Sequence, residues 1–273
     1  RVLINGFKSC GWNIVECRVD PESHLGLRKY WQLYLRYQEL ELKSDPSDLV
    51  IVAFPGQTVV WLARLLFGRG FIFDAFLSIY NSNVDDRQLY SPINPLAWRD
   101  FFLDWLAVKL SPTILLDTNE HVKYFAKTFG LSRVKAIRVF VGTDDQYFYP
   151  EPNSLKDDDK FIVHFHGSYI PLQGVEYIIK ASAILASDTR IVFRLIGQGQ
   201  DRAKINSLVK NLGISNIVFI DRVDYDKLKE YLNSAHVSLG IFGLTTKATR
   251  VIPNKVFEAM ACGRPIITAD SPA

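Results

Sequence analysis

The chain has 273 residues, of which 48% are hydrophobic and 22% charged, so it can form two domains with real hydrophobic cores. A formal net charge of +3 is far below that of a dedicated nucleic-acid-binding protein, and we expect no nucleic acid partner. The apolar stretch 61–77 contains Arg64 and Arg69, which excludes a membrane-spanning helix there. The chain begins without Met and ends directly after a predicted strand, which favours a fragment that lacks both ends.

Three cysteines, Cys10, Cys17 and Cys262, have no spacing typical of metal ligands. We therefore predict no metal site. An odd number of cysteines favours small buried side chains in a reducing compartment, which predicts a cytoplasmic protein.

Two sets of short runs rich in β-branched and aromatic residues predict strands. The first set covers 13–17, 49–55, 70–76, 113–118 and 135–142. The second set covers 161–167, 190–197, 216–223, 237–243 and 265–269. Helical periodicity alternates with these runs, as is typical of parallel sheets flanked by helices. The sequence thus predicts an α/β fold with two Rossmann-like domains.

The best candidate for a linker is the stretch 149–160, which holds two prolines, a serine and a charge run without apolar periodicity. We place the first domain at residues 1–150, with its first strand missing. The second domain covers residues 151–273 and is expected to be incomplete at its carboxyl end.

Ligands of open parallel sheets bind at the carboxyl ends of the strands, so the residues that follow each strand are candidates. Gly167 and Ser168 leave the first strand of the second domain, and Gly174 opens a helix. Its free backbone N–H groups and its dipole would favour an anion. One face of this helix is expected to hold Val175, Ile178, Ile179 and Ser182.

Glycine, basic and acidic residues also follow the later strands. They are Gly197, Gly199, Arg222, Val223, Lys247, Arg250, Asn254, Lys255 and Glu258. The G-x-G turn at 197–199 is by itself a weak signal and favours a plain tight turn.

A Gly-Ser turn at 167–168, the G-x-G turn and PNKVFEAMACGRPII at 253–267 together resemble the C-terminal domain of family 4 glycosyltransferases, which are retaining enzymes of the GT-B fold. The resemblance spans essentially the whole chain, and FEAMACGRPII is its most specific part. Looser matches are ECR (16–18), FDAFLSIYNSNVDDR (73–87), LLDTNEHVKYF (115–125) and VFVGTDDQYFYP (139–150). The resemblance implies two parallel sheets that face each other across a cleft, where a nucleotide-sugar binds as donor substrate without a further cofactor.

The resemblance also implies roles for single residues. Glu258 would hold the ribose hydroxyls, and Lys255 with the start of its helix would face the diphosphate. The donor-binding set would be Gly167, Ser168, Gln173, Gly174, Gly197, Arg222, Val223, Lys247, Arg250, Asn254, Lys255 and Glu258. Asp74 would act near the acceptor or the transferred sugar, and with Lys255 and Glu258 it forms the predicted catalytic set.

Simpler interpretations of the same residues stay open. Glu258 could form an ordinary helix pair with Lys255, three positions earlier, and Lys255 could be a solvated charge. Asp74 could cap the next turn. Thr118 and His121 are typical of a capped helix start, although His121 could also be catalytic.

The chain departs from the family pattern at the donor site. The earlier of two glutamates spaced eight residues apart is replaced by Arg250, and a usual lysine is replaced by Gln173. An arginine that usually follows the first strand is also absent from 167–174. We expect the cations Lys247, Arg250 and Lys255 to supply the positive charge that a diphosphate needs. An inactive homologue is the alternative.

The sequence therefore predicts transfer of a sugar from a nucleotide diphosphate-sugar to an acceptor hydroxyl, with retention of configuration. The alternatives are an epimerase or hydrolase of the same fold and a non-catalytic partner subunit. The acceptor is an unknown glycan or a lipid-linked molecule. Apolar and basic residues in 25–42 and 59–70 suit either contact with the inner face of an anionic membrane or packing as core-facing helices.

Overall fold

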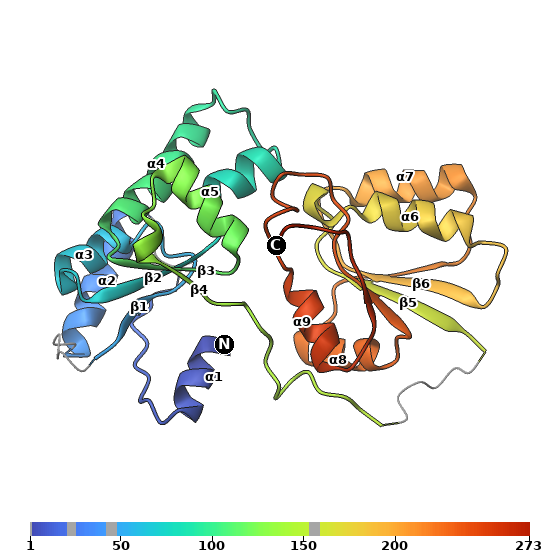
Figure 1. Ribbon diagram of the computed structural model, residues 1–273, viewed down its shortest axis with the longest axis horizontal. Coiled ribbons are helices and arrows are strands. Elements are labelled where there is room, and N and C mark those ends of the chain that lie inside the picture. Colours follow the sequence, from blue (N-terminus) through green and yellow to red (C-terminus); the bar gives the residue numbers. More distant parts are fainter. Residues whose placement is uncertain (1, 21–25, 42–47, 153–158) are drawn as a thin grey trace. The chain divides into compact units, whose positions relative to one another are not determined.

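The structure is a computed structural model that describes residues 2–20, 26–41, 48–152 and 159–273 (Figure 1). The chain divides into two compact units: the first holds residues 1–80 and 93–139, and the second holds 81–92 and 140–273. The segments 81–92 and 140–150 thus pack with the second unit, although they lie within the domain predicted for residues 1–150. Each unit has its own parallel sheet.

The sheet of the first unit has four parallel strands in the order β1-β2-β3-β4. Its strands are β1 (Val50–Val52), β2 (Phe71–Phe76), β3 (Thr113–Leu116) and β4 (Ala136–Arg138). Apolar side chains of this sheet, among them Phe73 and Ile114, pack with the helices in one hydrophobic core. Four of the five strands predicted for this unit are therefore confirmed.

The predicted strand at 13–17 is wrong. This segment has neither helix nor strand, and Val15 is 52% exposed. Within the described ranges no strand pairs with the outer edge of β1, so a run of β-branched residues here gains neither ladder hydrogen bonds nor a buried face.

The first unit also holds helices. They are α1 (Val2–Ser9), α2 (Leu27–Glu39), α3 (Val60–Phe67), α4 (Pro95–Leu110) and α5 (Asn119–Phe129), with a short 3₁₀ turn, η2 (Arg133–Lys135), before β4. The side chain of Thr118 accepts a hydrogen bond from the backbone N–H of His121 at 3.1 Å, which confirms the capped start of α5.

The sheet of the second unit has five parallel strands in the order β7-β6-β5-β8-β9. They are β5 (Phe161–His166), β6 (Ile191–Ile196), β7 (Ile217–Ile220), β8 (Val237–Leu239) and β9 (Ile266–Ile267). All five predicted strands of this unit are confirmed. The central strand β5 pairs in register with β6, so that His164 lies opposite Arg194.

Helices cover both faces of this sheet (Figure 1). One face carries α6 (Val175–Ile184) and α7 (Arg202–Leu212), and the other carries α8 (Tyr225–Asn233) and α9 (Asn254–Ala261). Two short segments, η1 (Asn81–Asp86) and η3 (Pro171–Gln173), complete the unit. The buried residues of α6 are Val175, Ile178, Ile179 and Ser182, as the sequence predicted.

The cysteines differ from the sequence expectation in part. Cys262 is buried as expected, but Cys10 and Cys17 are exposed. Cys10 follows α1, a helix with no buried residue, and Cys17 lies in the unpaired segment described above, so neither thiol has a core to enter.

Candidate functional site at the carboxyl edge of the second sheet

The three loops that follow β5, β6 and β8 pack closely against one another at glycine residues. A Cβ atom on Gly197 would lie 2.0 Å from the carbonyl oxygen of Gly167, and one on Gly174 would lie 2.4 Å from the backbone nitrogen of Gly243. Gly174 also has a φ of 62°, which side chains rarely tolerate. The G-x-G turn at 197–199 is therefore more than a plain turn, because its close backbone approach fixes the loops at this edge.

Lys255 lies beside these loops as a buried cation. Its side chain comes from the first turn of α9 and is 5% exposed. Its Nζ donates a hydrogen bond to Oε1 of Gln173, lies 3.7 Å from the ring centre of Phe165, and would be 2.9 Å from a Cβ on Gly167. Burial lowers the pKa of Lys255 well below its usual value, and the nearby charge of Glu258 opposes this shift. The solvated-charge interpretation of Lys255 is thus wrong.

Glu258 lies on the same helix and is 6% exposed. Its Oε2 is 2.7 Å from Nε2 of His166, the last residue of β5. The ammonium of Lys255 bonds instead to Gln173, so the ordinary pair between Lys255 and Glu258 is not the arrangement of this site. Glu258 is held by an imidazole, a contact that the sequence did not predict.

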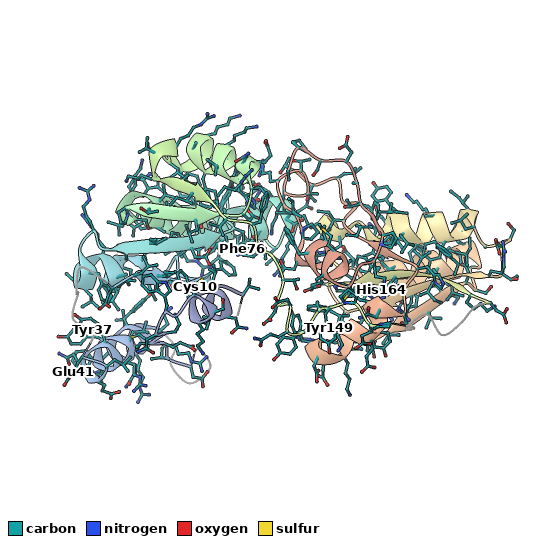
Figure 2. The ribbon with its side chains drawn as sticks, turned by 60° about the horizontal axis from the view of Figure 1, so that its bottom comes forward. Cys10, Tyr37, Glu41, Phe76, Tyr149 and His164 are labelled. Carbon is teal, nitrogen blue, oxygen red and sulfur yellow. The ribbon has the colours of Figure 1, made fainter. Side chains whose placement is uncertain are left out.

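The hydrogen bonds continue beyond His166. Nδ1 of His166 is 3.1 Å from Nε2 of His164, and Nε of Arg194 is 3.4 Å from Nδ1 of His164. His164, labelled in Figure 2, is fully buried on β5. His164 and His166 share one face because alternate strand residues do so, and this was the available sequence signal. The pairing of His164 with Arg194 depends on strand register, which the sequence does not specify.

Burial lowers the pKa of both histidines. For His164, positive charge on the neighbouring side chains His166, Arg194 and Lys255 would shift the pKa in the same direction. For His166 the hydrogen bond and the charge of Glu258 raise the pKa, which partly offsets burial and Lys255.

The other two predicted cations have different surroundings. Lys247 is buried, and its Nζ donates to Oγ of Ser82 at 3.0 Å and lies 3.8 Å from Oδ2 of Asp86. Arg250 is half-buried in the following turn, where its backbone N–H donates to the carbonyl of Lys247 at 2.9 Å. The contacts therefore place Lys255 beside Gly167 and Lys247 beside the segment 81–92.

The remaining predicted donor residues lie on loops or helix starts at this edge. Ser168 and Arg222 are exposed, and Asn254 is exposed at the first position of α9. Val223 is half-buried against a hydrophobic cluster that includes Phe148. The donor-binding roles of these residues stay predictions.

In the first unit the corresponding sheet edge carries two aspartates. Asp74 is half-buried within β2, which continues to Phe76, so Asp74 lies in a strand and not in the turn after it. Burial raises the pKa of Asp74, and the charge of Asp117 adds to this shift. Oδ1 of Asp117 contacts Nδ1 of His121, whose Nε2 is buried without a hydrogen-bond partner in the described ranges.

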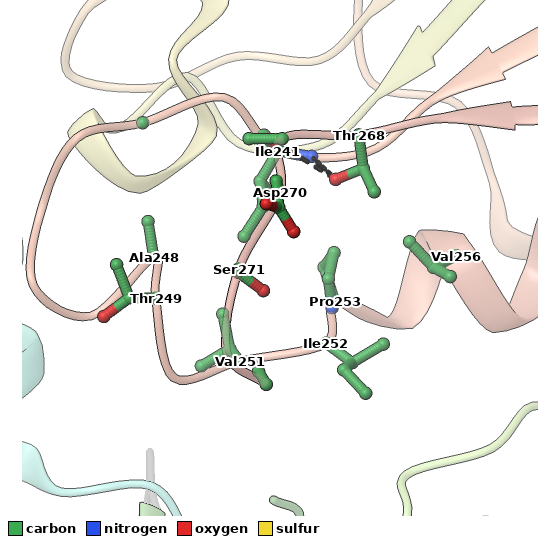
Figure 3. Close-up of a pocket in the computed structure, with 13 residues that line it drawn as sticks. Ile241, Ala248, Thr249, Val251, Ile252, Pro253, Val256, Thr268, Asp270 and Ser271 are labelled. Atoms are coloured by element: carbon green, nitrogen blue, oxygen red, sulfur yellow. Dashed lines mark hydrogen bonds between the residues drawn. The ribbon is translucent and has the colours of Figure 1, made fainter. Parts of the chain in front are cut away.

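A separate pocket of about 480 Å³ lies beyond the ends of β8 and β9 (Figure 3). The backbone N–H of Ile241 donates to Oγ1 of Thr268 at 3.1 Å on its wall. Residues 248–249, 251–253 and 268–271 form most of the rest of the lining. None of the predicted site residues lines this pocket, so the buried contacts of Lys255 and Glu258, not this cavity, define the candidate site.

No three His, Cys, Asp or Glu side chains in the described part of the chain are grouped so that they could hold a metal ion. No helix there is long and apolar enough to cross a membrane.

The chain is similar in sequence to known glycosyltransferases. Residues 150–273 match the family model described as Glycosyl transferases group 1. Among curated proteins, the chain is similar to the putative colanic acid biosynthesis glycosyl transferase WcaI of Escherichia coli (strain K12), with 29% identity over 115 residues, or 42% of this chain and 28% of that protein. The chain spans 28% and 34% of the lengths of the curated relatives that it matches.

Solved structures show the same fold. Sucrose-phosphate synthase from Thermosynechococcus elongatus has a TM-score of 0.67 at 16% identity, covering 94% of this chain and 65% of that chain. Alr3699/HepE of Anabaena, solved in complex with UDP-glucose, has a TM-score of 0.66 at 14% identity, covering 99% and 71%. The two parallel sheets are thus those of a GT-B glycosyltransferase fold.

Proposed function

We propose that the protein is a retaining glycosyltransferase of family 4 that moves a sugar from a nucleotide diphosphate-sugar to an acceptor hydroxyl. The observation that carries the proposal is the pair of buried contacts at one sheet edge, Lys255 with Gln173 and Glu258 with His166. The family match of residues 150–273 supports it, as does the UDP-glucose bound to the structurally similar HepE.

Lys255 would bind the diphosphate. Its ammonium lies beside Gly167 in the loop before α6, and the start of α9, which carries Lys255, favours an anion. Gln173 then has a clear role, because its amide oxygen holds the ammonium in place without adding a repelling charge. As the donor bond breaks, this preorganised cation would stabilise the leaving diphosphate.

Glu258 would bind the ribose. A carboxylate has two oxygens, and His166 occupies one side of Oε2. The other oxygen, Oε1, accepts no hydrogen bond from a described residue and can take one from a ribose hydroxyl. The carboxylate that would bind the ribose is therefore already oriented before the donor binds.

Asp74 is the candidate group near the acceptor, as base or orienting residue. The raised pKa of this half-buried carboxyl is a property that general acid and base groups share, although structural carboxyls have it too. An epimerase or hydrolase of the same fold would process the donor without an acceptor, so product analysis with and without acceptor separates these reactions from transfer. A non-catalytic partner subunit would bind no donor at all.

A screen of UDP-, GDP- and ADP-sugars for thermal stabilisation tests the proposal. One donor should raise the unfolding temperature of the wild type. Glu258→Gln keeps the shape of the side chain but loses its charge, so donor affinity should fall by about 1.5–2 kcal/mol, more than tenfold. The matched variant Glu230→Gln, on the exposed surface of α8, should bind like the wild type.

A 2′-deoxy donor supplies the converse measurement. Removing the hydroxyl should weaken binding to the wild type, and the loss should not add to that of Glu258→Gln, because both delete the same contact. Additive losses, or unchanged donor binding in Glu258→Gln, would contradict the ribose role.

Contact with an anionic membrane at the cytoplasmic face also stays a proposal, and α4 offers a better surface for it than the predicted stretches. Tyr30 of α2 packs on Trp61 of α3 with ring centres 5.1 Å apart, so these helices partly cover each other. On α4 the exposed side chains are Leu96, Trp98, Arg99, Phe101, Phe102, Trp105 and Lys109, whereas Asp100 and Asp104 are buried. Sedimentation with anionic but not neutral vesicles, lost on Trp98→Ser, tests this surface.

A further inference from the structure

A row of four polar side chains runs through the buried interior of the second unit, and we name it the imidazole row. Its members, in order, are Arg194, His164, His166 and Glu258. Arg194 is anchored on α8, where it donates to Oγ of Ser234 at 3.1 Å and to the carbonyl of Tyr231. The row therefore connects β6, β5 and α9 across the sheet.

The chemistry of its two ends fixes the direction of every hydrogen bond. A guanidinium can only donate and an ionised carboxylate can only accept. Nε of Arg194 donates to Nδ1 of His164, so a neutral His164 carries its proton on Nε2. That proton is donated to Nδ1 of His166, whose own proton is then on Nε2 and is donated to Oε2 of Glu258.

A second proton on either ring would break this order. An additional proton on His164 would oppose the N–H of Arg194, and one on Nδ1 of His166 would oppose the N–H of His164. The charged groups that act on the two rings are Arg194 from β6 and Lys255 and Glu258 from α9. Burial disfavours charge on both rings, and the guanidinium of Arg194 disfavours it further on His164, so both histidines stay neutral near pH 7.

We infer that His164 and His166 are positioning residues that fix Oε2 of the Glu258 carboxylate and leave Oε1 presented as an acceptor to a ligand hydroxyl. The inference rests on the proposed ribose role of Glu258. It adds a source of specificity, because an acceptor-only carboxylate in a dry site selects ligands that donate, such as a ribose, and rejects a phosphate or carbonyl at that position. The row thus separates the hydroxyl-binding part of the site from the cationic part at Lys255.

The binding test compares a nucleoside diphosphate with its 2′,3′-dideoxy analogue, using the base that stabilises the wild type most. His166→Leu removes the donor to Glu258 and should weaken the ribonucleotide about tenfold while changing the dideoxy analogue less than about threefold. His166→Gln, which can place an N–H near the same point, should recover most of the loss. His236→Gln is the control, since His236 belongs to the same unit but lies outside the row.

NMR of the wild-type protein without ligand measures the protonation of the imidazole row. The imidazole ¹⁵N shifts of His164 and His166 should show two neutral rings protonated at Nε2 between pH 6 and 8. Protonated rings, or a proton on Nδ1, would overturn the inference, as would equal losses for both ligands in His166→Leu. If ligands bind but His166→Leu has no selective effect, the positioning role fails while the proposed function stands. If no nucleoside diphosphate binds the wild type, both fail.

Discussion

The carboxyl edges of the two sheets hold their buried charges in different ways. In the second unit, the carboxylate of Glu258 is linked through two imidazoles to the guanidinium of Arg194. In the first unit, Asp104 on α4 accepts hydrogen bonds from Ser78 Oγ at 2.7 Å and from two backbone N–H groups. None of these donors to Asp104 in the described part of the chain is a cation.

The difference has a consequence for protonation. Burial raises the pKa of Asp104 to about 6, against the effect of its hydrogen bonds, and Asp74 nearby in the same unit also has a raised pKa. In the second unit the histidine pKa values are lowered instead. At the first edge, Asp104 therefore takes up a proton as the pH falls through about 6. A carboxylate whose hydrogen-bond network ends in a cation can stay available to bind a ligand. A carboxylate held only by neutral donors mainly fixes the conformation of the backbone that bonds to it.

The largest effect is expected for Asp104→Ala. It leaves the hydroxyl of Ser78 and the backbone N–H groups of Ile79 and Tyr80 without their acceptor, which should cost the first unit about 3 kcal/mol or more of unfolding free energy. Urea unfolding followed by tryptophan fluorescence measures this unit, because all five tryptophans lie in it.

Asp104→Asn is the matched control, because it retains one carbonyl oxygen and cannot ionise. The folded pKa of Asp104, about 6, is above its usual 3.8, so folded protein binds more protons in this window and wild-type stability should fall as pH rises through it. Asp104→Asn should lack this fall. A loss below about 0.5 kcal/mol in Asp104→Ala would contradict the structural role.

Lys255→Met tests the role of the Lys255 side chain in ligand binding, and we expect an effect of intermediate size. Affinity for the nucleoside diphosphate should fall by about 2–3 kcal/mol, whereas affinity for the free nucleoside should hardly change. Lys210→Met, at an exposed position of α7, is the control. Equal losses for both ligands would show that Lys255 only supports the fold.

Proton uptake adds a second readout for Lys255. Its pKa is lowered by burial in the free protein, and a bound diphosphate would raise it, so binding should take up a proton. Diphosphate affinity of the wild type should then fall as pH rises above the pKa of the free protein. Calorimetry in two buffers of different ionisation enthalpy measures the uptake, which Lys255→Met should abolish.

Much of this comparison was predictable from the sequence. Nine of the ten strands predicted from strand-like runs are present in the structure, and the helix that carries Lys255 and Glu258 was predicted from a single motif. The imidazole row was missed because a histidine finds its partner through strand register, which local patterns do not contain. Likewise, the hydrogen bond from Lys247 to Ser82 joins residues 165 positions apart in the chain. Local sequence patterns do not show which distant residues meet in the folded unit.

The smallest effect on stability is expected for Asp74→Asn. This variant tests whether the ionised carboxyl of Asp74 destabilises the first unit. The folded pKa of Asp74 is raised above 3.8 by burial and by Asp117, so the ionised carboxyl destabilises the folded state above that pKa. The asparagine variant should therefore be more stable than the wild type at pH 7, by less than about 1 kcal/mol because the side chain is only half-buried. This gain should shrink as the pH falls through the raised pKa and vanish below about pH 3, where the wild-type carboxyl is protonated in both states. Tryptophan-detected urea unfolding at both pH values measures it, with Asp48→Asn at an exposed position as control. A gain that is equal at the two pH values would mean that repulsion between Asp74 and Asp117 is not its source.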